Sequence, residues 1–373
     1  MSLLERVSAT APSLDARAAS GTPVRRVRTI SEFDNIQPIW DSYSQLVDWA
    51  SPVQHHVWAR TYAEVYSADR RFQVIIAGSG REIAIAPLFQ PRGRGRLELI
   101  GVKELYEVMD FLYSESSDIE ALAAAIAATR LPIVLRRMRQ DSRALTALKT
   151  AYRGNAVLFC RPARGCPWIA LDDSWVNPEQ HVNSGRRSDL RRARRNAEKI
   201  GRVTCEILSP KRQELPPLLE EAYRVEAAGW KGRNRTALAS DPRLGEFYRR
   251  YAAAAAERGM LRLSFLRIGG EAAAMQLAVA TCNRFWLFKI GYSEKFARCS
   301  PGILLMLESI RFAAQARLRS YEFLGAAEPW LRTWTSLEHP CVSFRAYPVN
   351  PRGIAALAAD GVAASVRKAR SGD

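Results

Sequence analysis

Apolar and polar positions in the first half of the chain follow helical spacing in some stretches and strand spacing in others. After Ser31, which can cap a helix, apolar residues recur every three or four positions. Two later apolar runs lie on either side of Gly78-Ser79-Gly80, as in two strands joined by a tight turn. The pattern predicts helices at 31–49, 55–66 and 142–152 and strands at 72–77, 83–89, 131–138 and 156–160.

The second half of the chain repeats this helix–strand–turn–strand order about 190 residues later. Gly259 is a typical helix stop, and Gly269-Gly270-Glu271 predicts a turn between two strands. The strand–helix–strand order that follows predicts a right-handed crossover and a parallel strand pair. The predicted elements are a helix at 244–257, strands at 261–268, 272–280 and 285–290, a helix at 301–316, a strand at 321–324, an amphipathic stretch at 329–337 and a strand at 341–347.

These elements predict an α/β (α+β) fold class. A chain of 373 residues is long for one core and sufficient for two. The repeated plan predicts two tandem domains of one architecture, each a mixed, mostly antiparallel sheet flanked by helices. The predicted divisions are a disordered tail at 1–22, an amino-terminal domain at 23–165, a carboxy-terminal domain at 166–349 and a terminal helix or tail at 350–373.

Composition and cysteine usage restrict the class of protein. A hydrophobic content of 47% and a charged content of 25% are typical of a soluble globular protein. The sequence contains neither the run of about 18 apolar residues that a membrane span requires nor a signal-peptide pattern. The six cysteines form no CxxC pair, and the four histidines show no metal-ligand spacing. We therefore expect small buried or half-buried thiols, no metal site and a cytoplasmic location.

The net charge of +17 predicts an anionic partner. Between Arg186 and Arg202 the chain has seven Arg and one Lys against Asp189 and Glu198. In one interpretation this is a solvated helix face, with Glu198 paired to Arg194 or Arg202. In the other, the arginines bind phosphates of a nucleotide-linked or lipid-linked sugar, of tRNA or of an anionic membrane surface. No recognition-helix motif accompanies the basic run, which argues against specific DNA binding.

This basic segment is predicted to be a helix. Asn183 or Ser184 can cap its start, and Gly201 can end it. Its apolar positions form one narrow stripe, so most of the arginines would face solvent. The stripe consists of Leu190, Ala193, Ala197 and Ile200.

The strongest local signal for a ligand site is the helix start Ser300-Pro301-Gly302. Ser300 is a good N-cap, Pro301 suits the first helical position, and Gly302 lets a ligand approach the exposed amide groups of the first turn. Those amides and the helix dipole form an anion site, with Arg298 close by. A well-capped core helix is the alternative. The position of this helix, between a third strand and a parallel strand, favours the ligand site.

Motifs along residues 168–347 resemble those of the CelD-like branch of the GNAT superfamily, relatives of the FemABX peptidoglycan aminoacyltransferases. Residues 24–165 resemble the amino-terminal half of that family more diffusely, through Pro87-Leu88 and Ile100-Gly101. The resemblance rests on the order and spacing of the motifs rather than on one of them. They are Arg187-Ser188-Asp189-Leu190-Arg191-Arg192, Trp230-Lys231-Gly232, Gly291-Tyr292, Phe296-Ala297, Ser300-Pro301-Gly302, Phe323-Leu324, Glu328-Pro329-Trp330 and Trp334.

The resemblance implies two GNAT-like domains and an acyl-CoA-dependent N-acyltransferase of exopolysaccharide or cellulose assembly. The co-substrate would be acetyl-CoA or another acyl-CoA, with no metal. The acceptor would be an amine or a nucleotide-linked or lipid-linked sugar. The turn at Ser300-Pro301-Gly302 would contact the CoA pyrophosphate. The implied cofactor-binding residues are Arg298, Cys299, Ser300, Gly302 and Ile303.

The sequence departs from the family where residues of the last motif would serve chemistry. The family commonly reads Gly-Asp-Glu-Pro-Tyr-Lys, whereas residues 326–331 read Ala-Ala-Glu-Pro-Trp-Leu, so Leu331 replaces the lysine. Acyl transfer to an amine needs a base for the amine proton and stabilisation of the oxyanion. We predict Glu328 as the base, Tyr292 as the acid toward the leaving thiolate, and Lys289 as the replacement for the lost lysine.

Four further residues are predicted to bind the acceptor: Trp230, Lys231, Glu322 and Trp330. Two other functions stay open. A FemABX-type aminoacyl-tRNA-dependent transferase fits the charge and the two-domain plan, although the coiled-coil arm of that family has no counterpart in this sequence. A degenerate GNAT-fold protein that binds a polyanion or a partner without turnover fits the loss at Leu331.

Overall fold

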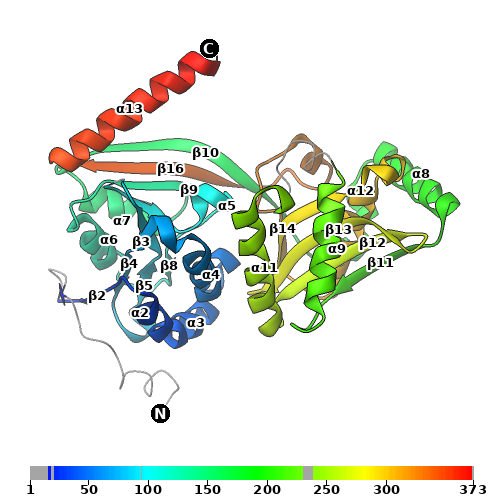
Figure 1. Ribbon diagram of the computed structural model, residues 1–373, viewed down its shortest axis with the longest axis horizontal. Coiled ribbons are helices and arrows are strands. Elements are labelled where there is room, and N and C mark those ends of the chain that lie inside the picture. Colours follow the sequence, from blue (N-terminus) through cyan, green and yellow to red (C-terminus); the bar gives the residue numbers. More distant parts are fainter. Residues whose placement is uncertain (1–15, 18–20, 94, 230–237, 372–373) are drawn as a thin grey trace. The chain divides into compact units, whose positions relative to one another are not determined.

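The computed structural model describes residues 16–17, 21–93, 95–229 and 238–371, and the chain divides into two compact units (Figure 1). Unit 1 comprises Met1–Gly165 and Pro340–Asp373, and unit 2 comprises Cys166–His339. The segment after Pro340 groups with unit 1 because strand β16 (Glu338–Pro348) pairs with β9 (Ile133–Arg139). The predicted carboxy-terminal domain at 166–349 therefore extends ten residues beyond the end of unit 2 at His339.

Unit 1 contains two sheets with helices packed beside them. One sheet has the strand order β1-β2-β4-β5-β8, and the other has β10-β16-β9-β7-β6-β3. The elements not yet given are β1 Ala16–Arg17, β2 Pro23–Val27, α2 Ile30–Asn35, α3 Gln37–Leu46, η2 Pro52–Gln54, α4 His56–Tyr66, η3 Ser67–Asp69, β3 Arg70–Phe72, β4 Val74–Ala77, η4 Gly80–Glu82, β5 Ala84–Ala86, β6 Leu88–Pro91, β7 Leu97–Leu99, α5 Val102–Leu105, β8 Leu112–Tyr113, α6 Ile119–Ala127, α7 Arg143–Ala151, β10 Ala156–Ala170 and α13 Pro351–Ser371.

Two predictions for unit 1 are corrected by local chemistry. The helix predicted at 31–49 is two helices, α2 and α3, because Pro38 has no amide hydrogen and its ring disfavours a helical turn before it. Its cap is Thr29, which forms a capping box with Glu32, and not Ser31. Part of the predicted disordered tail is the edge strand β1, paired with β2, and residues 1–15 and 18–20 lie outside the described residues. The predicted hairpin is confirmed as β4 paired antiparallel with β5.

Unit 2 contains one sheet with the strand order β11-β12-β13-β14-β15, and Trp168–Ala170 of β10 pair with β15. Only β14 and β15 of this sheet run parallel, as the strand–helix–strand pattern predicted. The elements are η5 Asp173–Val176, η6 Pro178–His181, α8 Ser184–Ile200, β11 Val203–Leu208, α9 Leu215–Ala227, η7 Leu238–Ser240, α11 Pro242–Glu257, β12 Leu261–Ile268, β13 Glu271–Thr281, β14 Arg284–Tyr292, η8 Glu294–Cys299, α12 Pro301–Gln315, β15 Ser320–Glu322 and η9 Pro329–Thr333.

Helices cover both faces of the unit 2 sheet. Phe285 of β14 meets Phe312 of α12 with ring centroids 6.3 Å apart, whereas Phe288 of the same strand meets Tyr251 of α11 at 5.6 Å. A β-bulge shifts the register of β14 between Leu287 and Lys289. Successive side chains of a strand point to opposite faces, so α12 and α11 lie on opposite sides of β14.

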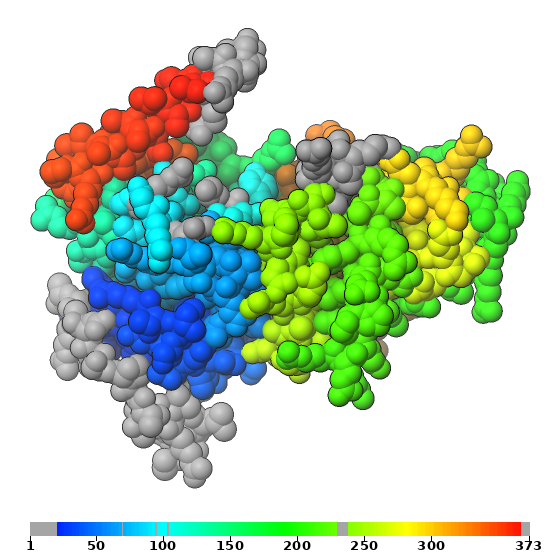
Figure 2. Space-filling view, viewed as in Figure 1, coloured from blue at the N-terminus to red at the C-terminus, as the bar shows by residue number. Residues whose placement is uncertain are grey.

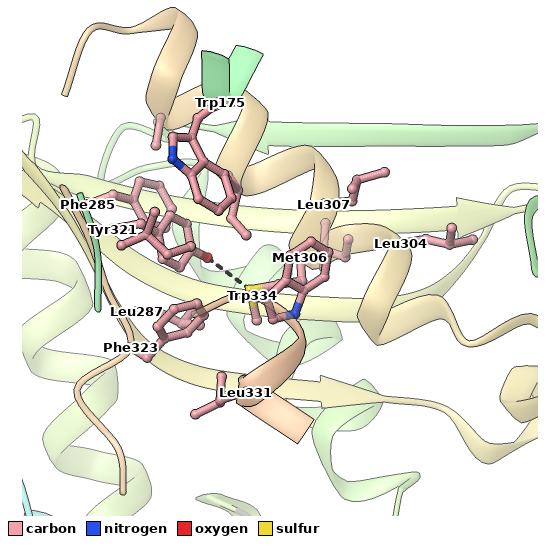
Figure 3. Packing of buried hydrophobic residues seen from close by; sticks show 14 of the residues in the cluster. Trp175, Phe285, Leu287, Leu304, Met306, Leu307, Tyr321, Phe323, Leu331 and Trp334 are labelled. Atoms are coloured by element: carbon pink, nitrogen blue, oxygen red, sulfur yellow. Dashed lines mark hydrogen bonds between the residues drawn. The ribbon is translucent and has the colours of Figure 1, made fainter. Parts of the chain in front are cut away.

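The core between α12 and the sheet is aromatic and aliphatic (Figure 3). Tyr321 of β15 stacks on Phe285 of β14 at 4.8 Å, and both are fully buried. This core fixes α12 against the sheet and therefore sets the position of its first turn. Among the described residues, no helix combines the length and the apolar character that crossing a bilayer requires.

Candidate functional site

A pocket of about 360 Å³ opens where α12 begins and β14 ends. It lies within unit 2, between the first turns of α12 and the last residues of β14, and η9 supplies one wall. The lining residues are Met275, Gln276, Ile290, Gly291, Tyr292, Ala297, Ser300, Pro301, Gly302, Ile303, Met306 and Trp330.

The strand register leaves this end of β14 accessible. β14 pairs with β15 only from Arg284 to Trp286, while β14 itself continues to Tyr292. The strand pair therefore opens toward the pocket, and the backbone beyond Trp286 is not taken up by the β15 ladder.

The first turn of α12 starts from an unusual backbone conformation. Ser300 is the N-cap residue, as predicted, but it adopts φ 45° and ψ 50° in the left-handed region and its side chain makes no cap hydrogen bond. Its carbonyl accepts from Ile303 and Leu304, and Pro301 occupies the first turn. Pro301 has no amide hydrogen and the Ile303 amide donates to Ser300, so this turn offers an anion the Gly302 amide together with the helix dipole.

Two glycines hold the end of β14 close to its neighbours. A Cβ at Gly291 would lie 2.6 Å from Cα of Glu226 on α9, and a Cβ at Gly229 would lie 2.6 Å from the carbonyl oxygen of Tyr292. Both distances are too short for a side chain, so glycine is required for this contact between α9 and β14. At Gly302, by contrast, a Cβ would lie 3.6 Å from Cδ1 of Tyr292, an ordinary contact distance. The packing of the protein itself therefore does not require glycine at position 302.

The inner wall of the pocket contains one buried polar side chain, Gln276, among apolar residues. The Gln276 amide nitrogen lies 3.7 Å from the Met306 sulfur, which the Tyr321 hydroxyl also approaches at 3.4 Å (Figure 3). The Tyr321 and Ser309 hydroxyls are 2.9 Å apart. Burial raises the pKa of Tyr321, although hydrogen bonds with Ser309 and Gln276 oppose the shift. Tyr321 is therefore a neutral hydrogen-bonding group at physiological pH.

Three of the five predicted cofactor-binding residues line the pocket: Ser300, Gly302 and Ile303. Cys299 is buried beneath them, and burial raises the pKa of its thiol. Arg298 is exposed, and its carbonyl oxygen accepts from the Asn196 side chain on α8 at 3.4 Å. The structure thus brings together the residues of the first helical turn but not the Cys299 side chain.

The predicted catalytic residues lie in three settings. Tyr292 lines the pocket. Glu328 is exposed at the N-cap of η9 and does not line the pocket, although it lies two residues before Trp330, which does. The Lys289 ammonium lies 4.6 Å from the ring centroid of Tyr248 on α11. Because of the β-bulge, Lys289 points to the sheet face opposite α12, so it does not converge with Tyr292.

Of the four predicted acceptor-binding residues, the structure brings only Trp330 to the pocket. Glu322 is buried in β15, where its carboxylate accepts from Ser320 at 2.6 Å and lies 3.4 Å from Arg284 and 3.1 Å from His339. These partners account for its buried charge. Trp230 and Lys231 lie outside the described residues.

Sequence reasoning missed Met275, Gln276, Ile290 and Met306 as pocket residues. One of them carried a signal. Gln276 is the only polar residue between Ala272 and Ala280, and a lone amide in an otherwise apolar strand marks a position where a hydrogen-bond partner is needed. The other three are apolar residues that periodicity assigns to the core in any helix or strand.

The basic helix α8 exposes its arginines on the surface of unit 2, at the right edge of Figure 2. Asn183 caps it by accepting from the Arg186 amide, as one of the two predicted caps. Leu190, Ala193 and Ala197 are buried, but Ile200 is 58% exposed and does not belong to the buried stripe. The predicted pairing of Arg194 with Glu198 is wrong, because Arg194 reaches Glu308 of α12 at 2.8 Å.

The six cysteines are free. Cys160 and Cys205 are exposed, which corrects the expectation that all would be buried or half-buried. Within the described ranges, no group of three or more His, Cys, Asp or Glu side chains could hold a metal ion.

Comparisons with known proteins agree with this geometry. Residues 184–332, which include the whole pocket, match the sequence profile of the family described as acetyltransferase (GNAT) domain. A comparison with curated protein sequences finds no significant match.

Two solved structures resemble most of the chain. One is the C-terminal domain, from Agrobacterium fabrum, of a protein provisionally named a lysylphosphatidylglycerol synthetase, with 11% identity over 89% of this chain and 97% of that chain and a TM-score of 0.55. The other is FemX, with 13% identity over 88% of this chain and 97% of that chain and a TM-score of 0.55. At such identities the similarity concerns the fold. Together with the mixed sheets of both units, it confirms the predicted α/β fold in two domains, and the family match identifies residues 184–332 as similar to a GNAT domain.

Proposed function

We propose that unit 2 is an N-acyltransferase that moves an acyl group, in the first place acetyl, from acyl-CoA to an amine or a sugar-linked acceptor. The observation that carries this proposal is the pocket between the first turn of α12 and the carboxyl end of β14, within the segment that matches the acetyltransferase family. By its sequence motifs we place the chain in the CelD-like branch, in cytoplasmic steps of polysaccharide or cell-envelope biosynthesis.

In this proposal the donor is held by backbone and apolar groups. Its pyrophosphate lies at the first turn of α12, where Gly302 allows close approach and the helix dipole favours negative charge. Arg298 adds a positive charge at the exposed rim. The extended arm of the donor follows the carboxyl end of β14, against Ile290 and Trp330.

Transfer then needs one proton taken from the acceptor and one given to the thiolate. The acceptor amine attacks the thioester carbonyl carbon, the tetrahedral intermediate collapses, and the carbon–sulfur bond breaks. We assign the leaving thiolate's proton to Tyr292, which lines the pocket, and the acceptor's proton to Glu328, at the start of η9. We assign no step to Lys289, because its ammonium packs over Tyr248 on the other face of the sheet.

Donor binding is tested by calorimetric titration of acetyl-CoA and longer acyl-CoAs into the full chain. We expect Gly302→Val to weaken binding at least about tenfold, because the side chain fills the space in front of Tyr292. Gly361→Val in α13 is the matched control: it makes the same substitution within a helix, but a Cβ there meets no atom within 4 Å. If the unmodified protein binds no acyl-CoA, or if both variants bind it equally well, the proposed pocket is wrong.

Turnover is tested separately from binding. Glu328→Gln should lower the transfer rate by about 10²–10⁴-fold while acyl-CoA affinity stays unchanged. An unchanged rate would remove Glu328 as the base. Donor binding without transfer to any amine or sugar acceptor would instead favour the non-catalytic alternative that Leu331 suggests.

A second candidate is a FemABX-type transferase that uses aminoacyl-tRNA. The exposed arginines of α8 favour it, since guanidinium groups suit phosphate oxygens. Aminoacyl-tRNA and vesicles with anionic lipids should then bind with a strong salt dependence, and Arg191→Ala with Arg195→Ala should weaken that binding. Binding that persists in high salt or in the double variant would exclude α8 as the polyanion surface.

A further inference from the structure

Among the described residues that line the proposed donor pocket, Gln276 has the one amide side chain. It is 1% exposed, and the residues around it on that wall are apolar: Met275, Ile290, Met306 and Trp330. A buried amide in such a setting needs hydrogen-bond partners for both of its ends.

The nitrogen of the Gln276 side-chain amide has a hydrogen-bond partner within the protein. Its nitrogen lies 3.7 Å from the Met306 sulfur, and a thioether sulfur carries no hydrogen and can only accept. The Tyr321 hydroxyl lies on the same sulfur at 3.4 Å, and Ser309 lies 2.9 Å from that hydroxyl. These contacts place the N–H end of Gln276 toward α12 and β15.

The oxygen of the same amide differs from the nitrogen in this respect. Among the described residues, Oε1 of Gln276 is buried and has no hydrogen-bond partner. Ser264, the cross-strand neighbour of Gln276 on β12, also has a buried hydroxyl without a partner in the described parts of the chain, but it does not line the pocket. Of these two groups, only Gln276 can be satisfied by a molecule that enters the pocket.

We propose that Oε1 of Gln276 accepts a hydrogen bond from an N–H or O–H group of the ligand in this pocket. Gln276 thereby selects acyl donors that have such a group opposite Oε1. This inference rests on the proposed function. A pocket built around a buried polar group rejects ligands that leave this group unpaired far more strongly than an apolar pocket rejects an added hydroxyl. The N–H or O–H group has two possible sources: an amide of the CoA arm, common to all donors, or a hydroxyl or amine on the acyl group.

The experiment compares three ligands by calorimetry on the full chain: CoA, isovaleryl-CoA and 3-hydroxybutyryl-CoA. The last two differ by a methyl group in place of a hydroxyl, so their volumes are matched. The variant is Gln276→Met, which keeps the length of the side chain and replaces the amide oxygen by a thioether sulfur, a much weaker hydrogen-bond acceptor. Ser264→Ala is the control, because it removes the neighbouring unpaired hydroxyl outside the pocket.

Two results support the proposal and identify the source. If the acyl group supplies the hydrogen, the unmodified protein prefers 3-hydroxybutyryl-CoA about tenfold or more, and Gln276→Met removes that preference. If the CoA arm supplies it, Gln276→Met weakens all three ligands by a similar factor. In both cases Ser264→Ala leaves the affinities unchanged.

Two other results overturn it. If all three ligands bind and Gln276→Met, with its melting temperature retained, changes neither affinity nor preference, the proposal about Gln276 is wrong and the donor pocket stands. If Gln276→Met melts far below the unmodified protein, Gln276→Glu takes its place as the variant. Gln276→Glu keeps an oxygen acceptor and should retain the affinities and the preference of the unmodified protein. If none of the three ligands binds, the proposed function fails and the inference fails with it.

Discussion

The buried carboxyl of Asp110 in unit 1 allows a quantitative prediction about stability. Oδ1 of Asp110 accepts from the Phe111 amide at 2.7 Å and from the Ser142 hydroxyl at 3.0 Å, and Oδ2 accepts from the Tyr113 hydroxyl at 3.3 Å. Burial is the largest influence and raises the pKa of Asp110 from its ordinary value of 3.8 to about 6, although these hydrogen bonds and the charge of Arg139 oppose it. The folded protein therefore binds a proton at Asp110 more tightly than the unfolded chain does.

The sign and size of the effect follow from that difference. Below a pH of about 3.8 the carboxyl is protonated in both states and has no pH-dependent cost. Between that pH and about 6 the unfolded chain releases its proton first, so folding stability falls as the pH rises. For this one group the total fall is about 3 kcal/mol. Above a pH of about 6 the cost is constant.

Asp110→Asn removes the free-energy cost of ionising a buried carboxyl and keeps the hydrogen-bond geometry at this position. The amide oxygen can accept from Phe111 and Ser142, and the amide nitrogen can donate to Tyr113, whose hydroxyl already accepts from the Arg143 amide. We expect the variant to gain stability relative to the unmodified protein by about 3 kcal/mol as the pH rises from about 4 to about 7. Other titrating groups are present in both proteins and cancel in the difference.

The assay must report on unit 1 alone, because the two units can unfold separately. Hydrogen exchange of the α6 and α7 amides in increasing urea gives the free energy of unfolding of this region at each pH. A stability difference that stays the same from pH about 4 to about 7 would refute the assigned pKa of Asp110. A difference that shrinks as the pH rises would refute the direction as well.

Two further predictions concern the elements that position the pocket. Gly291→Ala should destabilise unit 2 by about 1–3 kcal/mol in urea unfolding, because the new Cβ would lie 2.6 Å from Cα of Glu226; Gly361→Ala, in open space, should stabilise α13 slightly. Equal effects of the two glycine substitutions would contradict the close contact. Tyr321→Phe should lower the free energy of unfolding of unit 2 by only about 1 kcal/mol, because Ser309 keeps its hydrogen bond to the Met306 carbonyl at 3.0 Å. A decrease of about 3 kcal/mol or more in urea unfolding would mean that the Tyr321 hydroxyl has a larger role.

Features that depend on a few neighbouring residues could be predicted from the sequence. Strand β12 occupies residues 261–268 as its apolar run predicts, and α12 begins at Pro301 after the N-cap Ser300. The start of α8 at Asn183 follows from capping chemistry. Periodicity, caps and glycine turns act within a turn or two of the chain, so their signals are complete in the local sequence.

Which side chains line the pocket depends on the tertiary structure and could not be predicted from local sequence. A β-bulge in β14 turns Lys289 to the face of α11, and no residue type near it announces the bulge. The buried partners of Glu322 come from two other strands and remove it from the pocket. Gln276 reaches the pocket because β13 lies beneath the first turns of α12.

The difference has one physical reason. Local sequence patterns were enough to predict many of the helices and strands, the start of a helix after Ser300, and one strongly basic helix. Which side chains share a pocket depends on strand register and on how α12 packs across the sheet. Those are set by contacts between segments far apart in the chain, such as the stacking of Phe285 on Tyr321, and no local pattern contains them.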